Sequence, residues 1–205
     1  QNPYERCLFN KTVDGVQISV CFHVDDLLIS CSRDCLIDDL VGALNKRFKK
    51  VTERSGDTLS YLGMTIKTQS SGNITVSMER YVEECLGLSD SEKVAVTPAT
   101  EDLFEEPNEE PLNSEMKDRF HSAVAKVLYL AKRVRPELLT AISHLASRVS
   151  APSVSDWAKL RRVFSYIRGT KKHCLIFLAG SELELLTYID ASYAVHADFK
   201  SRSGM

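Results

Sequence analysis

Two adjacent carboxylates, Asp25 and Asp26, interrupt a run of apolar residues that otherwise has the pattern of two β-strands, over residues 16–22 and 27–31. Aspartate is depleted from strand interiors and favoured at turns, so the pair predicts a tight turn between antiparallel strands. A divalent cation best offsets the repulsion between neighbouring carboxylates, because hard oxygen ligands suit Mg²⁺. The pattern therefore favours a metal-binding turn, with an ordinary exposed turn as the alternative.

The residues on either side of this pair extend the sheet and predict a helix. Residues 6–10 are expected to form a further strand. Asp14–Gly15 would join it to the strand over residues 16–22, because this dipeptide is a strong signal for a type I′ hairpin. Apolar residues then recur at helical spacing over residues 34–50, with Ser32 as a candidate N-cap. We expect this helix to pack its apolar stripe on one face of the sheet.

The rest of the chain alternates between strand and helix patterns, so the expected fold class is α+β. Residues 59–67 and 73–78 predict a second hairpin, and a short helix follows over 79–87. Further elements are expected as helices near 114–133, 136–149 and 154–168, and as strands over 174–178 and 183–190.

Charge is distributed unevenly, although the net charge is only −2. Residues 101–110 hold six acidic residues and no basic one, whereas residues 117–172 hold thirteen Lys or Arg and three acidic residues. A basic helical block is typical of a surface that faces phosphates, and solvated helix faces are the alternative. The acidic run and three prolines of residues 88–113 predict a mobile connector without regular structure.

Composition restricts the class of protein further. The chain has 205 residues, 43% of them hydrophobic and 26% charged, which suits a soluble protein with a sizeable core. No apolar run approaches the ~18 residues that a membrane span needs. Six cysteines without a Cys-x-x-Cys spacing favour reduced thiols in a cytosolic setting. A zinc site is the alternative that the spacing disfavours, built from Cys21, His23, Cys31 or Cys35.

Short motifs follow one another along nearly the whole chain, beginning with His-Val-Asp-Asp at 23–26 and Tyr-Leu-Gly-Met at 61–64. The others occur at residues 127–130, 135–136, 157–162, 166–170, 188–194 and 200–204. Each motif is a weak signal alone. In this order they resemble the reverse transcriptase of Ty1/copia-type retrotransposons, from the C-terminal part of the polymerase region into the start of ribonuclease H.

This resemblance implies four regions within a fragment of a longer polyprotein. Residues 1–87 would be the C-terminal half of the palm with a hairpin like the primer grip, and residues 88–113 an acidic, proline-containing linker. Residues 114–172 would form a basic helical region like a thumb or connection, and residues 173–205 the truncated start of a ribonuclease H-like domain, with a strand pair.

The activity implied by the resemblance is RNA-directed DNA synthesis through two-metal nucleotidyl transfer. Its cofactor would be Mg²⁺, with Mn²⁺ as an alternative. Asp25 and Asp26 would be catalytic metal ligands of the polymerase, and Asp190 would be the first metal-binding carboxylate of ribonuclease H. The residues expected to contact nucleic acid are His23, Leu62, Gly63, Lys132, Arg133, Arg161, Arg162, Arg168, Lys171 and Lys172.

The implied partners are an RNA or DNA template–primer duplex, deoxynucleoside triphosphates and the rest of the polyprotein, without a membrane. The expected location is the cytoplasm, in a virus-like particle of the parent element. His23 departs from the Tyr or Phe usual at that position of the family. A further carboxylate should come from an earlier palm strand that lies before Gln1, so we expect these 205 residues alone not to polymerise. The alternative functions are a decayed or domesticated remnant that only binds nucleic acid, and a plain structural domain.

Overall fold

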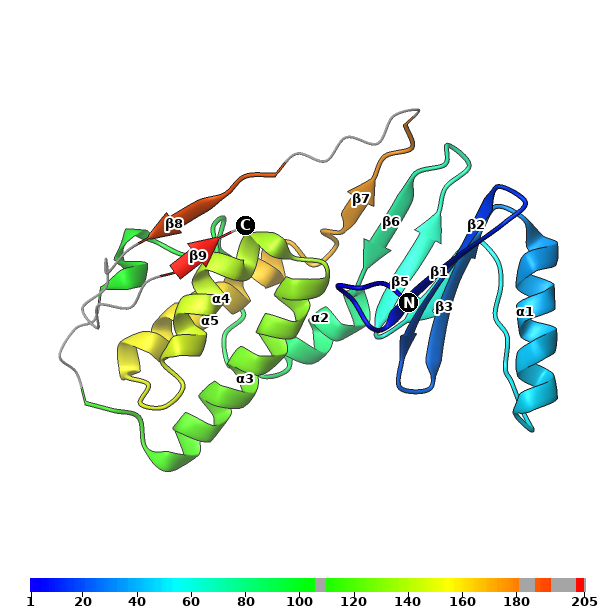
Figure 1. The fold of residues 1–205 in the computed structure, drawn as a ribbon. Helices are drawn as coiled ribbons and strands as arrows, with labels where there is room; N and C mark the ends of the chain where they lie inside the picture. The colour runs from blue at the N-terminus through cyan, green and yellow to red at the C-terminus, as the bar shows by residue number, and fades with distance from the viewer. Residues whose placement is uncertain (106–109, 181–186, 193–201, 205) are drawn as a thin grey trace.

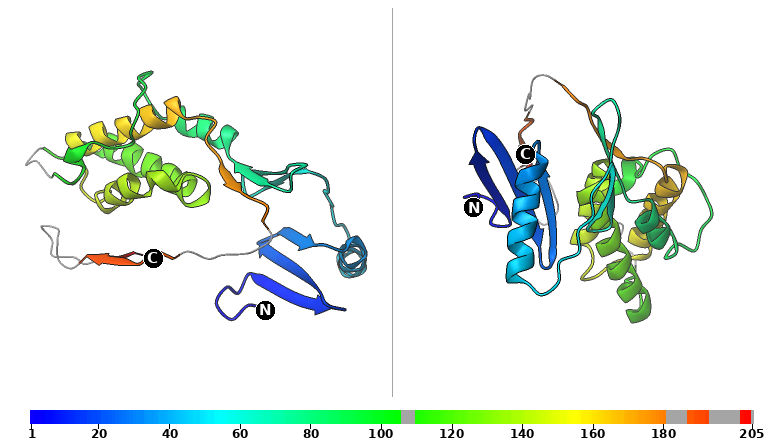
Figure 2. Two further views of the ribbon diagram at one scale, coloured as in Figure 1. Left: turned by 90° about the horizontal axis from the view of Figure 1, so that it is seen from above. Right: turned by 90° about the vertical axis from the view of Figure 1, so that its right-hand side faces the viewer.

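The computed structural model describes residues 1–105, 110–180, 187–192 and 202–204. Its fold is α+β, with antiparallel sheets and a group of helices, as the sequence predicted. Figure 1 shows helix α1 (Asp34–Arg47) beside the sheet of strands β1–β3 (residues 8–31) at one end of the molecule. Helices α3 (Ser114–Arg133), α4 (Leu139–Ser147) and α5 (Val154–Gly169) lie at the other end. Strands β5 (Met64–Thr68), β6 (Ile74–Ser77) and β7 (Leu175–Phe177) lie between them. Figure 2 shows the same separation of α1 from α3–α5 when the molecule is seen from above.

The first sheet has the strand order β1-β2-β3, and all its pairs are antiparallel. Asp14 and Gly15 both have positive φ (49° and 77°), so the predicted type I′ turn is confirmed. Helix α1 packs next to β3. The bounds of these elements are β1 (Leu8–Val13), β2 (Val16–His23), β3 (Asp26–Cys31) and α1 (Asp34–Arg47).

Helix α1 begins at Asp34 as predicted, but its N-cap residue and its C-terminal end differ from the prediction. Its N-cap is Arg33 rather than Ser32, and no side chain caps it. It ends at Arg47 because Phe48 already has an extended backbone (φ −113°, ψ 139°). No residue of the helix is fully buried. Its apolar stripe is half-buried, since only a three-stranded sheet lies against it.

The second sheet has the order β4-β5-β6-β7. The single strand predicted over residues 59–67 is wrong, because Leu62 and Gly63 have positive φ (50° and 76°) and form a tight turn between β4 and β5. The sequence paired residues 174–178 with a strand over 183–190, of which 183–186 lie outside the described residues. The strand that pairs with β7 is instead β6. The bounds are β4 (Thr58–Tyr61), β5 (Met64–Thr68), β6 (Ile74–Ser77) and β7 (Leu175–Phe177).

The helices supply most of the hydrophobic core. Its fully buried side chains include Phe120 and Leu130 of α3, Ile142 of α4, and Leu160 and Phe164 of α5. The predicted helices over 79–87, 114–133 and 154–168 are confirmed, and the one over 136–149 divides into a 3₁₀ turn and α4. The bounds are α2 (Glu79–Leu86), η1 (Glu101–Phe104), α3 (Ser114–Arg133), η2 (Pro136–Leu138), α4 (Leu139–Ser147) and α5 (Val154–Gly169). No helix among the described residues has both the length and the apolar character of a membrane span.

Residues 88–105, here called the strap, do not form the mobile connector that their composition predicted. They lie along α5 and include the 3₁₀ helix η1. Leu103 of the strap is only 5% exposed and belongs to the core. After the gap at 106–109, the Leu112 N–H donates to the Pro152 carbonyl (2.8 Å). Pairing with α5 therefore orders a segment whose composition alone opposes order.

Strands β8 (Asp190–Ser192) and β9 (Arg202–Gly204) pair antiparallel with each other. The motifs expected at residues 188–194 and 200–204 fall partly outside the described residues. The backbone of Asp190 lies opposite Gly204 in this pair, and its side chain is outside what the structure describes. The division into four regions stays a prediction.

Candidate functional site

The tip of the β2–β3 hairpin carries the candidate catalytic carboxylates. His23 and Asp26 face each other in the last register pair, so Val24 and Asp25 form the turn. Val24 has a positive φ of 54°, which is uncommon for a β-branched residue. The side chains of His23, Asp25 and Asp26 are all exposed. The local sequence thus places two carboxylates and an imidazole at one solvent-facing corner.

The β4–β5 hairpin lies against this corner through Tyr61. The Tyr61 hydroxyl donates to Cys21 Sγ (3.9 Å), and the residue is 9% exposed. Burial, the hydrogen bond with Cys21 and the nearby charge of Asp26 together raise the pKa of Tyr61 to about 12, with burial as the largest cause. Tyr61 therefore lies near the Asp-bearing turn and joins the two sheets. The sequence placed this residue in a family motif without predicting the contact.

The Leu62–Gly63 turn next to Tyr61 is held from the helical side by Tyr129 of α3. The Tyr129 hydroxyl donates to the Leu62 carbonyl (2.9 Å). The Arg133 guanidinium lies 5.1 Å from the centre of the Tyr129 ring. Tyr129 thus brings together three residues that the sequence predicted as nucleic-acid contacts, Leu62, Gly63 and Arg133.

Gly63 is required by the backbone conformation of the turn and not by close packing of a neighbour. A Cβ atom at this position would lie 3.5 Å from Met78 Cε, which is ordinary van der Waals contact. The positive φ of the turn is what requires glycine here. A second tyrosine that the sequence did not single out, Tyr81 of α2, supports the same region. Its ring centre is 5.3 Å from that of Tyr129, and its hydroxyl donates to the Lys126 carbonyl (3.3 Å).

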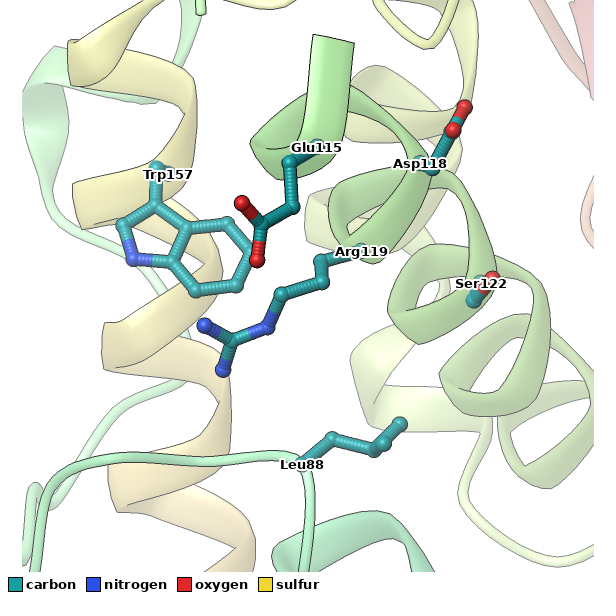
Figure 3. Close-up of a pocket in the computed structure, with 6 residues that line it drawn as sticks. All are labelled: Leu88, Glu115, Asp118, Arg119, Ser122 and Trp157. Atoms are coloured by element: carbon teal, nitrogen blue, oxygen red, sulfur yellow. The ribbon is translucent and has the colours of Figure 1, made fainter. Parts of the chain in front are cut away.

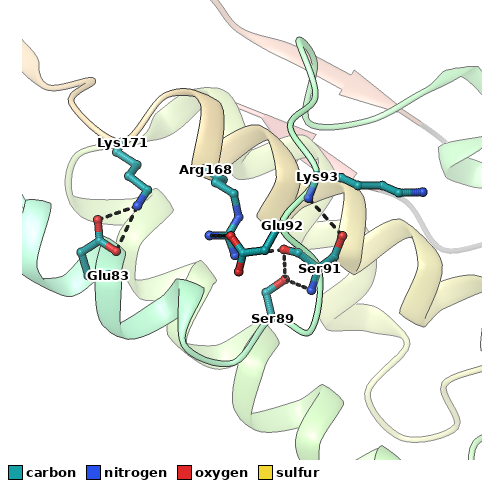
Figure 4. A network of polar contacts seen from close by, with 7 residues as sticks. All are labelled: Glu83, Ser89, Ser91, Glu92, Lys93, Arg168 and Lys171. Carbon is teal, nitrogen blue, oxygen red and sulfur yellow. Dashed lines mark hydrogen bonds and ion pairs between the residues drawn. The ribbon is translucent and has the colours of Figure 1, made fainter.

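The basic residues of α5 contact the strap. Ion pairs join Arg161 to Asp90 (3.2 Å) and Arg168 to Glu92 (2.8 Å), as Figure 4 shows for Arg168. The other contacts to strap oxygens are Arg168 Nη2 to the Ser91 carbonyl, Arg162 Nη2 to Thr97 Oγ1 (both 2.9 Å), and Lys159 Nζ to the Glu105 carbonyl (2.5 Å). Arg161, Arg162 and Arg168 therefore already have partners inside the molecule.

The remaining predicted cations divide into two kinds. Lys171 pairs with Glu83 of α2 (2.8 Å), as Figure 4 also shows. Lys132, Arg133 and Lys172 are exposed. The predicted nucleic-acid contacts thus include exposed cations and cations held in internal pairs, and their role in binding stays a prediction.

The strap also changes the electrostatics of one of its own acids. A hydrogen bond from the Thr100 hydroxyl lowers the pKa of Asp102. Desolvation opposes this shift as the second-largest effect, and the positive charges of Lys159 and Arg162 make smaller contributions that lower the pKa. Asp102 is therefore held ionised by the strap and by α5.

Trp157 is packed rather than free to stack on a base. It is 9% exposed, its ring centre lies 6.4 Å from that of Phe120, and the Arg119 guanidinium lies 5.3 Å from its centre. Trp157 and Arg119 line an open pocket of about 320 Å³, which Figure 3 shows. Because Glu115 and Asp118 line that pocket beside a single arginine, it does not suit a phosphate.

A complete metal centre is not assembled in the described part of the chain, where no three His, Cys, Asp or Glu side chains come together. The alternative zinc site on Cys21, His23, Cys31 or Cys35 is excluded by strand register. Cys31 pairs with Ile18, three residues from Cys21 on β2, so Cys31 and Cys21 lie on opposite faces of the sheet. All six cysteines are free.

Comparison with known proteins shows which proteins this chain is similar to. The chain is 28% identical over 200 residues to a transposon Ty5-1 protein of Saccharomyces cerevisiae, covering 96% of this chain and 63% of that protein. It is 29% identical over 204 residues to the retrovirus-related Pol polyprotein from transposon TNT 1-94 of Nicotiana tabacum, covering 95% of this chain and 15% of the polyprotein. An uncharacterized mitochondrial protein of Arabidopsis thaliana is 28% identical over 174 residues, which cover 84% of this chain and 70% of that protein. No protein-family model matches, and no solved structure matches significantly.

These relatives make the chain a homologue of retrotransposon Pol polyproteins. Transposon proteins and retrovirus-related Pol polyproteins as homologues over most of the chain support the resemblance to Ty1/copia-type retrotransposons that its motifs carry. The chain spans less than two thirds of the Ty5-1 protein and about a seventh of the TNT 1-94 polyprotein.

Proposed function

We propose that this chain is part of an RNA-directed DNA polymerase and carries the Asp–Asp motif of its palm. One observation carries the proposal. Two exposed carboxylates, Asp25 and Asp26, lie at the tip of the β2–β3 hairpin, and Tyr61 of the β4–β5 hairpin contacts Cys21 of β2 close enough to be influenced by the charge of Asp26. The likeness of nearly the whole chain to proteins named as retrovirus-related Pol polyproteins supports it.

Asp25 and Asp26 would hold Mg²⁺ or Mn²⁺, because adjacent exposed carboxylates offer the hard oxygen ligands that these ions prefer. A bound metal pair activates a primer 3′-hydroxyl and neutralises the triphosphate in this class of reaction. Two carboxylates are too few ligands for two ions, so a further carboxylate from outside the described residues is required. His23, opposite Asp26, and the Leu62–Gly63 turn would position the primer end beside the carboxylates.

The other parts of the chain have roles that follow from the same proposal. The β1–β3 sheet with α1 would be the palm layer, and helices α3–α5 the thumb-like region that holds a template–primer duplex. Asp190 would contribute to the ribonuclease H metal site. Deoxynucleoside triphosphates and the rest of the polyprotein complete the partners, in the cytoplasm of the host.

The test is primer extension on an RNA template by the complete reading frame that contains this chain. We expect Asp25→Asn to abolish extension. Asp14→Asn is the matched control, because Asp14 is an exposed turn carboxylate of the same sheet. Full activity of both Asp25→Asn and Asp26→Asn would refute the assignment. The 205-residue chain alone should show no extension, and extension that Asp25→Asn abolishes would overturn that expectation.

A nucleic-acid-binding remnant is the second candidate function. It is favoured by the absence, among the described residues, of a third side chain that joins Asp25 and Asp26. The exposed cations Lys132, Arg133 and Lys172 would supply salt-sensitive binding without catalysis. Duplex binding by the complete reading frame, without nucleotide addition in Mg²⁺ or Mn²⁺, would favour the remnant over the polymerase.

A further inference from the structure

The strap and helix α5 have opposite charges. Strap residues 88–105 include five acidic residues and one lysine, whereas α5 includes four basic residues and one aspartate. All four basic residues of α5 contact strap oxygens. The face of α5 that its composition would offer to phosphates is therefore occupied by an acidic segment of the same chain.

The two ends of the strap are anchored by apolar side chains. Leu103 is 5% exposed, and Leu88 packs against the same core. Val94 and Val96 in the middle are 65% and 89% exposed. The middle contacts α5 through the Ala95 N–H, which donates to the Ser165 carbonyl (3.1 Å), through Val94 beside Gly169, and through polar and charged side chains. Apolar burial is therefore concentrated at the two ends of the strap, and the middle is held mainly by polar contacts.

The contacts of the middle are of a kind that another anion can replace. The Arg161–Asp90 pair is exposed on both sides (45% and 50%), and exposed ion pairs are individually weak; in the Arg168–Glu92 pair the carboxylate is 88% exposed and the arginine 14%. Arginine binds phosphate oxygens with the same geometry that it uses for carboxylates. A regular array of phosphates would satisfy Arg161 and Arg168 as well as the strap does.

We propose that the strap is an intramolecular competitor for the basic face of α5, which a nucleic-acid duplex displaces when it binds. The inference rests on the nucleic-acid binding of the proposed function and adds a regulation to it. In the strapped state the duplex meets the exposed cations outside α5 and the exposed part of Arg161, whose charge Asp90 already pairs. In the released state it also meets Lys159, Arg161, Arg162 and Arg168, so the acids of the strap lower duplex affinity.

The first experiment compares two double variants of the 205-residue chain with equal charge change, by fluorescence anisotropy with a 20-base-pair RNA–DNA duplex. Asp90→Asn/Glu92→Gln removes the ion pairs of Arg161 and Arg168 with the strap and leaves the bond of Arg168 to the Ser91 carbonyl. Asp38→Asn/Asp39→Asn is the control on exposed positions of α1, at the other end of the molecule (Figure 1). If Arg161 and Arg168 each gain one phosphate contact, the slope of log duplex affinity against log salt concentration should steepen by about 1.8. Lowering salt from about 200 to about 50 mM should then strengthen the strap variant about tenfold more than the control.

The outcomes separate the two hypotheses. Equal gains for both variants would overturn the strap proposal, because net charge alone would explain them, and would leave nucleic-acid binding intact. Absence of salt-sensitive duplex binding in the parent chain and in both variants would remove the binding function and the competitor together.

A second measurement follows the strap directly by hydrogen exchange. Saturating duplex should speed the exchange of the Ala95 amide, which is bonded to α5 in the free protein, while amides inside α5 stay protected. Unchanged or slower exchange at Ala95 in a chain that binds duplex would show that the strap remains in place, and would overturn the proposal.

Discussion

The contact between the strap and the end of α5 predicts an unusual response to Gly169→Ala. A Cβ atom at Gly169 would lie 2.7 Å from Val94 Cγ1 and 3.4 Å from the Ala95 carbonyl oxygen. The first distance is too short for two carbon atoms, so Val94 and the backbone after it would have to move away from the helix. Such overpacking costs about 1–3 kcal/mol.

Helix propensity acts in the opposite direction. Alanine is better than glycine in a helix by up to about 1 kcal/mol, and Gly169 is the last residue of α5. The clash should outweigh this gain, so we expect Gly169→Ala to lower the free energy of unfolding by about 1 kcal/mol. In a Val94→Ala background the obstructing methyl groups are gone. The same substitution should there raise the free energy of unfolding by about 0.5–1 kcal/mol.

The assay is urea unfolding of the parent chain, both single variants and the double variant, followed by far-ultraviolet circular dichroism. The expected coupling between positions 94 and 169 is about 2 kcal/mol, as in a double-mutant cycle of contacting residues. Val94→Ala alone should change little, because Val94 is 65% exposed. Equal effects of Gly169→Ala in the two backgrounds would refute the packing of the strap on α5.

Three further predictions test other contacts. Tyr129→Phe should lower the free energy of unfolding by about 1 kcal/mol in urea unfolding, because it removes the bond to the Leu62 carbonyl and keeps the ring; an unchanged stability would contradict that bond. Ser153→Ala should cost about 1 kcal/mol in the same assay, because Ser153 caps α5 in a reciprocal pair with Asp156, and a neutral result would deny the cap. Asp102 has a lowered pKa, so its contribution to the free energy of unfolding is complete above its unfolded pKa of about 4. That contribution is lost as pH falls through the folded pKa. A carboxyl titration by NMR should show that Thr100→Val raises the pKa of Asp102; no change would remove the hydrogen bond as its main cause.

Local signals in the sequence predicted most of the elements. Asp14–Gly15 marks its turn because both residue types tolerate positive φ. The Leu62–Gly63 turn was missed because leucine rarely adopts positive φ, so the alternating pattern seemed continuous across it. For Ser32 the residue type was right for a cap, but the backbone of Arg33 takes the capping position instead.

Long-range contacts were beyond local signals. Tyr129 is 67 residues from Leu62, and nothing near either residue marks the hydrogen bond between them. The strap was predicted to be a mobile connector because prolines and acids oppose order when no partner is considered. Its partners lie on α5, where Arg168 is 77 positions after Ser91, and only the fold brings them together.

The basic residues of the sequence therefore fall into two groups that only the structure distinguishes, those paired with acids of the same chain and those that are exposed. The acidic residues after α2 and the basic residues of α5 contact one another, so counting the basic block overstates the free positive surface. Arg133 is different, because it is exposed and stacks on the tyrosine that holds the Leu62–Gly63 turn. If the two proposals hold, a duplex can contact Arg133 without movement of the strap, whereas contact with the paired cations of α5 requires the strap to leave. Duplex affinity at Arg133 and duplex affinity along α5 should then be separable, and the strap acids should change only the second.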